Sequence, residues 1–178
     1  MSRVEMVNPQ DTSGEKKDIL GQIQKAFGVT PNMFKTIGNS TAALKMMWAG
    51  FGALGAGKIG TKLGEQIAVA VANENRCEYC LAAHTALGKG AGLSDETMAQ
   101  AQAGKSSDPK TQAALTFAIK LVKERAHISQ ADVESLRKVG FTNDEIAEIL
   151  AHVALNIFTN YTNVAFDVPV DFPKVQLR

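Results

Sequence analysis

The residues with the clearest capacity for chemistry are two cysteines and a histidine in the segment Cys77-Glu-Tyr-Cys80-Leu-Ala-Ala-His84. If a helix begins at Cys77, these three side chains sit at positions i, i+3 and i+7 and share one face. That spacing brings the two sulfurs close enough for a disulfide and sets the imidazole one turn beyond Cys80. The amino-terminal end of a helix and a Cys-x-x-Cys pair both favour the thiolate. A thiolate attacks a peroxide oxygen or a disulfide sulfur, and a neighbouring thiol resolves the sulfenic acid that a peroxide leaves.

Glu65 is the second candidate for chemistry. On the helix expected before the cysteines, it shares a face with Ala68 and Ala72, at i+3 and i+7. A carboxylate on such a small, apolar face could approach a neighbouring helix closely and exchange protons there. The alternative for Glu65 is a solvated helix face.

Two other interpretations of the cysteines remain open. Cys77, Cys80 and His84 could bind structural zinc with His127 or His152 as a fourth ligand, although the chain has no second close ligand pair. The cysteines could also be inert core residues, since free cysteine packs well in interiors. His127 and His152 themselves are interpreted as structural, because neither has a visible partner in the sequence.

The elements that must position these residues are helices almost from end to end. Ser129 with Asp132 resembles a capping box, and Thr142 with Glu145 matches the pattern fully. The expected helices cover 14–26, a segment opened by Thr30-Pro31, a segment from Ser40 through Phe51, 61–74, 77 to 88 or 90, a short segment after Ser94, 109–125, a segment after Ser129, and 143–165. The buried stripe expected on the last helix is Ile146, Ile149, Leu150, Val153 and Ile157. Only 168–175 suggests a strand, and two prolines interrupt it. The sequence therefore predicts an all-α helical bundle.

Two other features of the sequence are a glycine-rich stretch and a group of large apolar residues. The glycine-rich stretch 50–60 is the one candidate for a hinge or loop insertion, and it has no phosphate-binding pattern. Several large apolar residues are interpreted as core or subunit contacts rather than as a substrate pocket: Met33, Phe34, Met46, Met47, Trp48 and Phe51.

Composition narrows the class of protein. The chain has 178 residues, 45% of them hydrophobic and 21% charged, with a net charge of +1. These values predict one globular domain over 1–178, with its core in 40–166, and argue against a nucleic-acid partner. No apolar run is long enough to span a membrane, and the amino terminus does not resemble a signal peptide, so a cytoplasmic location is expected.

The run Glu65-x11-Cys77-x-x-Cys80-x-x-x-His84 resembles the signature of alkylhydroperoxidase AhpD, in the carboxymuconolactone decarboxylase superfamily. The resemblance centres on 61–92 and extends more loosely to 107–126 and 142–165. It implies an AhpD-like helical fold, with Cys80 as the peroxidatic cysteine and Cys77 as the resolving cysteine and entry point for electrons. Glu65 and His84 would form the proton relay. Where AhpD has a further relay histidine, this chain has Tyr79, a possible supporting residue whose phenol is a poor base at neutral pH.

The resulting hypothesis is an AhpD-like thiol peroxidase that reduces hydroperoxides through a Cys77/Cys80 dithiol–disulfide cycle without a cofactor or metal. The resemblance implies a dithiol reductant, such as a lipoyl protein or a thioredoxin-like protein, and a homo-oligomer, either a trimer or a hexamer. The alternatives are a general thiol–disulfide oxidoreductase and a non-catalytic helical oligomer that binds zinc or senses oxidants.

Overall fold

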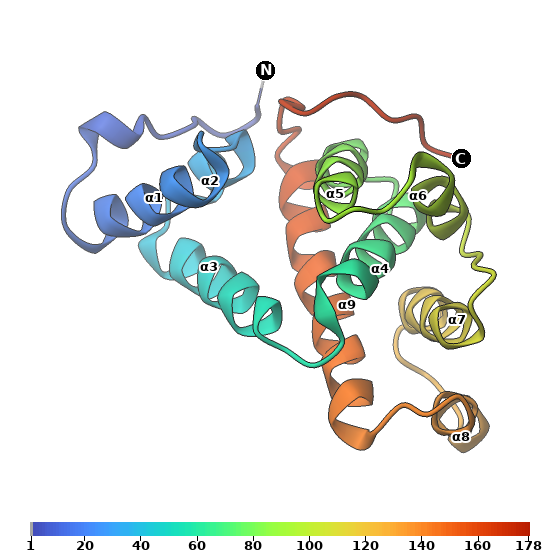
Figure 1. Ribbon diagram of the computed structural model, residues 1–178. Coiled ribbons are helices and arrows are strands. Elements are labelled where there is room, and N and C mark those ends of the chain that lie inside the picture. The colour runs from blue at the N-terminus through green and yellow to red at the C-terminus, as the bar shows by residue number, and fades with distance from the viewer. Residues whose placement is uncertain (1) are drawn as a thin grey trace.

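The computed structural model describes residues 2–178, and every regular element in this range is helical (Figure 1). A short 3-10 helix, η1 (Pro9–Asp11), precedes α1 (Gly14–Phe27), α2 (Asn32–Ile37), α3 (Thr41–Gly55), α4 (Gly60–Glu74), α5 (Glu78–Gly90), α6 (Asp95–Gln102), α7 (Pro109–Lys123), α8 (Gln130–Lys138) and α9 (Asn143–Ala165). Because residues 2–178 contain no strand, the all-α prediction is confirmed. The segment 168–175, which suggested a strand, has no regular structure.

Helix α4 is the centre of the molecule, and it packs against α5, α6, α7 and α9. The run from Gln66 to Ala72 is buried without interruption. A helix that is buried on all sides must be surrounded by other elements, and the small side chains of Ala68 and Ala70 let those neighbours approach closely. Helix α4 therefore fixes the position of Glu65 relative to the helices around it.

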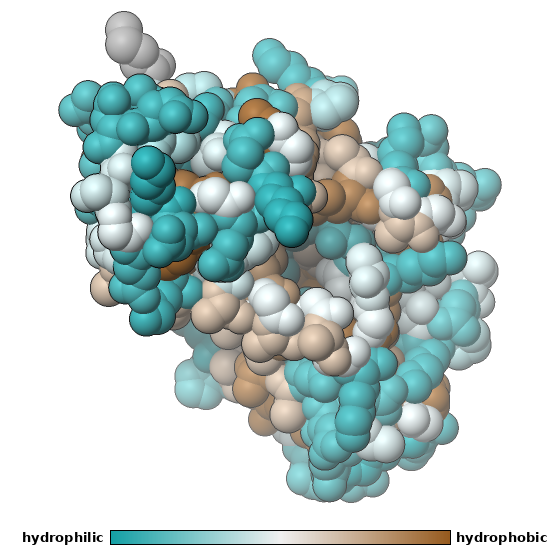
Figure 2. Space-filling model, turned by 60° about the vertical axis from the view of Figure 1, so that its left-hand side comes forward, coloured by the Kyte–Doolittle hydropathy of each residue, from teal (hydrophilic) through white to brown (hydrophobic). Residues whose placement is uncertain are grey.

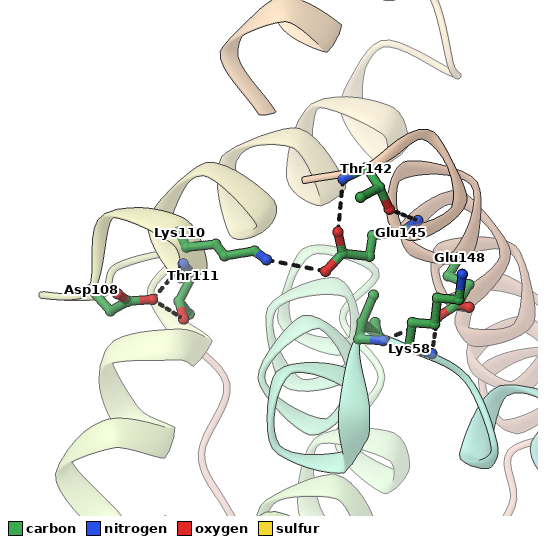
Figure 3. A network of polar contacts seen from close by, with 8 residues as sticks. Lys58, Asp108, Lys110, Thr111, Thr142, Glu145 and Glu148 are labelled. Carbon is green, nitrogen blue, oxygen red and sulfur yellow. Dashed lines mark hydrogen bonds and ion pairs between the residues drawn. The ribbon is translucent and has the colours of Figure 1, made fainter. Parts of the chain in front are cut away.

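The capping boxes set the beginnings of two later helices. Ser129 with Asp132 and Thr142 with Glu145 each form both reciprocal hydrogen bonds, as the sequence predicted. Glu145 also pairs with Lys110 of α7, with 3.1 Å between Oε1 and Nζ (Figure 3). The first turn of α9 is thereby tied to α7.

The glycine-rich stretch forms less loop than the sequence suggested. Because α3 continues to Gly55 and α4 begins at Gly60, only residues 56–59 connect the two helices. The Glu148 carboxylate of α9 accepts hydrogen bonds from the backbone N–H groups of Lys58, at 2.6 Å, and Ile59, at 3.1 Å (Figure 3). This carboxylate holds the turn against α9.

The buried side chains of α9 are only partly those that the sequence predicted. Ile149 and Val153 are buried as expected, but Leu150 is 48% exposed, so this part of the predicted stripe is wrong. The interior side of α9 carries polar residues instead: Asn156, Thr159, Asn160 and Asn163 are all buried. Their spacing places them on one helical face, and α9 packs against α4 and α5. A polar stripe of α9 therefore lies inside the protein.

The two ends of the chain complete the arrangement. Helices α2 and α3 pack against α9, and the chain beyond α9 passes over α5 towards α6 (Figure 1). On the face shown in Figure 2, apolar side chains lie among hydrophilic ones and the surface is hollowed near its middle. Within residues 2–178, no helix combines the length and the apolar character needed to cross a membrane.

Candidate active site

The two cysteines lie where α4 turns into α5. Cys77 is the N-cap of α5, not its first helical residue, and its Sγ accepts a hydrogen bond from the backbone N–H of Cys80 at 3.3 Å. Arg76 has a φ of 57°, which reverses the chain between the two helices. Both cysteines are reduced and buried, with exposed fractions of 1% and 2%. The structure therefore brings the two thiols together inside the protein, at the amino-terminal end of a helix.

Polar groups around Cys80 favour its thiolate. The Asn163 side-chain amide donates a hydrogen bond to Cys80 Sγ at 3.1 Å, whereas the Thr159 hydroxyl, 4.0 Å from the same sulfur, is an acceptor for the protonated thiol. Burial opposes ionisation most strongly, but the hydrogen bond with Cys77, the charge of His84 and the Asn163 amide outweigh it and lower the pKa of Cys80. The hydrogen bond with Cys80, together with burial, raises the pKa of Cys77. Cys80 is therefore the sulfur that ionises first.

Glu65 and His84 form a buried pair beside this sulfur. The distance between Glu65 Oε2 and His84 Nδ1 is 2.8 Å, and the side chains are 16% and 10% exposed. Burial favours the neutral imidazole, but the Glu65 charge, its hydrogen bond and the nearby Cys80 raise the pKa of His84. The imidazolium is therefore stabilised between a carboxylate and a thiolate. The structure thus assembles all four residues that the sequence motif singled out.

Tyr79 lies apart from this group, although it separates the two cysteines in the sequence. Its hydroxyl accepts a hydrogen bond from the backbone N–H of Met33 at 3.2 Å. The pKa of Tyr79 is raised, first by burial, while the Met33 hydrogen bond opposes this increase and the nearby Asp171 carboxylate adds to it. Tyr79 therefore joins α5 to α2 and to the carboxy-terminal segment.

A small cavity of about 30 Å³ opens beside Cys80 and His84. Its lining is otherwise almost entirely apolar and consists of Phe27, Pro31, Met33, Phe34, Phe51, Tyr79, Ala83, Leu87, Thr159 and Phe172. Met33, Phe34 and Phe51, which the sequence favoured as core or subunit contacts, thus also line this cavity. A larger hollow of about 840 Å³ between α5, α6 and the carboxy-terminal segment contains neither cysteine nor histidine.

The remaining histidines do not complete a zinc site. His127 is exposed beyond the end of α7. His152 packs on α4, where a Cβ added to Gly64 would lie 3.0 Å from its Cε1. Across residues 2–178, no group of three or more His, Cys, Asp or Glu side chains is placed to hold a metal ion.

The sequence reading missed three residues around the thiols: Thr159, Asn163 and Phe172. The first two lie on the polar stripe of α9. Their spacing of four residues places them on one helical face, but the buried face of this helix was predicted from its apolar residues alone. Phe172 belongs to the irregular carboxy-terminal segment, for which no sequence pattern gives a position.

Comparisons with known proteins agree with this arrangement. A sequence model of the carboxymuconolactone decarboxylase family matches residues 41–124. A solved structure from Ralstonia eutropha JMP134, an uncharacterised peroxidase-related protein described as an alkylhydroperoxidase AhpD core, is 24% identical over 96% of this chain and 92% of that chain, with a TM-score of 0.85. A peroxidase-related protein from Silicibacter sp. TM1040 is 25% identical over 94% of this chain and 91% of that chain, with a TM-score of 0.83. No curated protein sequence matches the chain.

A third similar structure is that of a protein named for a different activity. The debrominase Bmp8, solved as a cysteine-to-alanine variant with 2,3,4-tribromopyrrole, is 21% identical over 94% of this chain and 91% of that chain, with a TM-score of 0.82. At this identity the likeness extends to the fold alone.

Over residues 41–124 the chain is therefore similar to proteins of the carboxymuconolactone decarboxylase family. Its fold is AhpD-like, and the structures that share this fold include peroxidase-related proteins.

Proposed function

We propose that this protein is a thiol-dependent peroxidase that reduces hydroperoxides through a dithiol–disulfide cycle of Cys77 and Cys80. The observation that carries the proposal is the environment of Cys80. Its sulfur accepts a hydrogen bond from Asn163 at 3.1 Å and lies beside an imidazole that Glu65 holds at 2.8 Å. This arrangement supplies both a nucleophile and a proton donor in one buried cavity.

In the proposed cycle, Cys80 is oxidised first and Cys77 then forms a disulfide with it. The Cys80 thiolate attacks the distal oxygen of the hydroperoxide, the O–O bond breaks, and Cys80 becomes a sulfenic acid. The departing alkoxide takes a proton from the His84 imidazolium and leaves as an alcohol, or as water when the substrate is hydrogen peroxide. The Cys77 sulfur then attacks the sulfenic acid, which closes the disulfide and releases water. A dithiol reductant returns both cysteines to thiols and becomes a disulfide itself.

The burial of both sulfurs favours peroxide reduction over general thiol–disulfide exchange. Cys77 and Cys80 are 1% and 2% exposed, and the adjoining cavity measures about 30 Å³. A small hydroperoxide meets less obstruction there than a disulfide carried on a folded protein. We therefore expect faster turnover with hydroperoxides than with protein disulfides.

The proposal includes the reductant and the assembly that the family resemblance implies. We take the reductant to be a dithiol, either a lipoyl protein or a thioredoxin-like protein, and the active form to be a homo-oligomer. Exposed apolar side chains on α9 support self-association, since Leu150, Tyr161 and Val164 are 48%, 62% and 48% exposed.

The test compares wild type with Cys77→Ser and Cys80→Ser, which serve as matched controls for each other. We expect both variants to lose dithiol-dependent consumption of tert-butyl hydroperoxide. After one peroxide pulse, dimedone should label Cys80 in the Cys77→Ser protein, because its sulfenic acid has no resolving thiol, and should label nothing in Cys80→Ser. A fully active Cys80→Ser protein would contradict the proposal. If the wild type reduced a disulfide substrate faster than a hydroperoxide, the result would favour a general thiol–disulfide oxidoreductase.

A further inference from the structure

The carboxy-terminal segment 167–178 is fixed along its length across α5. At its start, the backbone N–H of Val168 donates to Asn163 O at 3.0 Å. Near its end, Gln102 Nε2 donates to Gln176 O at 2.8 Å, and the backbone N–H of Arg178 donates to Asn73 Oδ1 at 3.0 Å. The segment is therefore a tethered part of the fold, although it has no regular structure.

Asp171 ties the middle of this segment to the rest of the protein. Its Oδ2 accepts a hydrogen bond from the backbone N–H of Asn32 at 2.8 Å, and its carboxylate is near enough to Tyr79 to raise the pKa of that phenol. The Asn32 side-chain amide also donates to Pro169 O at 3.1 Å. One exposed carboxylate thus connects the beginning of α2, the phenol between the two cysteines and the carboxy-terminal segment.

Phe172 follows this anchor and forms one wall of the cavity beside Cys80. Its ring meets Tyr79 edge-on, with 5.7 Å between centroids and an interplanar angle of 84°. It lines the same cavity as His84 and as Phe34 from the amino-terminal helices. The cavity of about 30 Å³ holds about two water-sized groups. A hydroperoxide with a bulky organic group can therefore enter only if a wall moves.

We propose that Phe172 is a specificity-determining residue that restricts access to Cys80 to small substrates, and that Asp171 is the positioning residue that holds it in place. The inference rests on the proposed peroxidase function for its substrate class, namely hydrogen peroxide and small alkyl hydroperoxides. Phe172 and Pro31 are the wall residues outside the helices, and Phe172 has the larger side chain, whereas Phe34 and Phe51 are carried by α2 and α3. Shortening Phe172 enlarges the cavity and removes its edge-on contact with Tyr79, but it leaves the contacts between helices in place.

The experiment measures size selectivity at Cys80 in two independent ways. The first is the ratio of kcat/KM for cumene hydroperoxide to that for hydrogen peroxide. The second needs no turnover: it is the ratio of Cys80 alkylation rates by N-phenylmaleimide and N-methylmaleimide, with the modified cysteine identified by mass spectrometry. We expect Phe172→Ala to raise both ratios about tenfold, the usual effect of a small volume change in an apolar pocket. Phe172→Leu should lie between Phe172→Ala and wild type.

Matched variants distinguish the positioning of Phe172 by Asp171 from a general loosening of the carboxy-terminal segment. Asp171→Ala should raise both ratios in the same direction as Phe172→Ala, whereas Asp171→Asn, which keeps an acceptor for the Asn32 N–H, should stay nearer wild type. Val175→Ala alters the same segment away from the cavity and should leave both ratios unchanged. Unchanged alkylation ratios in a folded Phe172→Ala protein would overturn the inference. A shifted alkylation ratio in a protein that consumes no hydroperoxide would support the wall role and reject the peroxidase function.

Discussion

The hydrogen bond from Asn163 to Cys80 makes a quantitative prediction about thiol reactivity. The Asn163 amide is buried, 3% exposed, and donates to the sulfur at 3.1 Å. A hydrogen bond to a charged group contributes about 1.5–3 kcal/mol, and one pKa unit corresponds to about 1.36 kcal/mol. Replacing Asn163 with leucine, which has a similar volume and no donor, should therefore raise the pKa of Cys80 by about 1–2 units.

The assay is the pH dependence of Cys80 alkylation by iodoacetamide, with the modified peptide identified by mass spectrometry. Because only the thiolate reacts, the rate rises with pH as Cys80 loses its proton. The lowered pKa places the wild-type midpoint below that of an ordinary thiol, about 8.5. In Asn163→Leu the midpoint moves to higher pH, and the rate below it falls about 10- to 100-fold, following the 1–2 unit shift.

Two controls sharpen this measurement. Asn143→Leu makes the same substitution at an exposed position of the same helix and should leave the midpoint unchanged. Asn163→Asp places a carboxylate beside the sulfur and should raise the midpoint as well, because a like charge disfavours the thiolate. A folded Asn163→Leu protein with the wild-type midpoint would refute the reasoning, since the amide would then contribute nothing to the ionisation of Cys80.

Three further predictions concern the surroundings of the thiols. Glu65→Gln should lower peroxide turnover at neutral pH by about 10²–10⁴-fold, the usual contribution of acid–base catalysis, and a wild-type pH profile of kcat/KM would contradict the relay. Tyr79→Phe should cost about 1–3 kcal/mol of unfolding free energy, because a buried N–H loses its acceptor. Its pH profile should match wild type while hydrogen exchange of the Met33 amide accelerates, and a shifted profile would instead place the phenol in the relay. Tyr161→Glu should lower the mass found by light scattering, since it puts charge on the exposed apolar face of α9, whereas Lys138→Glu on α8 should not. An unchanged mass for Tyr161→Glu would locate the subunit contact elsewhere.

The fold was largely predictable from the sequence because its helices carry strong local signals. Capping residues such as Ser129 and Thr142 fix helix beginnings through short-range hydrogen bonds, and those bonds depend little on the remaining chain. Glycine was a weaker guide. The stretch 50–60 suggested a loop, but α3 continues through Gly52 and Gly55 because packing outweighs their low helix propensity.

The candidate site was predictable only where its residues are neighbours in sequence. Cys77, Cys80 and His84 follow one another along a single helix end, so their spacing indicates their proximity. Asn163 contacts Cys80 although the two residues are 83 positions apart in the sequence. Asparagine is mostly exposed in proteins, so the burial of Asn163 was not expected from its residue type. Long-range placement of a polar residue depends on how α9 packs, which helical periodicity alone does not determine.

The unequal acidities of the two thiols also determine which sulfur of a Cys77–Cys80 disulfide a reductant attacks. In disulfide exchange, the sulfur with the lower pKa is the better leaving group. The pKa of Cys80 is lowered and that of Cys77 is raised, so an incoming thiolate should bond to Cys77 and expel Cys80. In the proposed cycle, the mixed disulfide with the reductant would therefore form at Cys77, and Cys80 would leave as the anion that the next peroxide requires. Under that proposal, each reduction would leave Cys80 ready to attack without a separate deprotonation step.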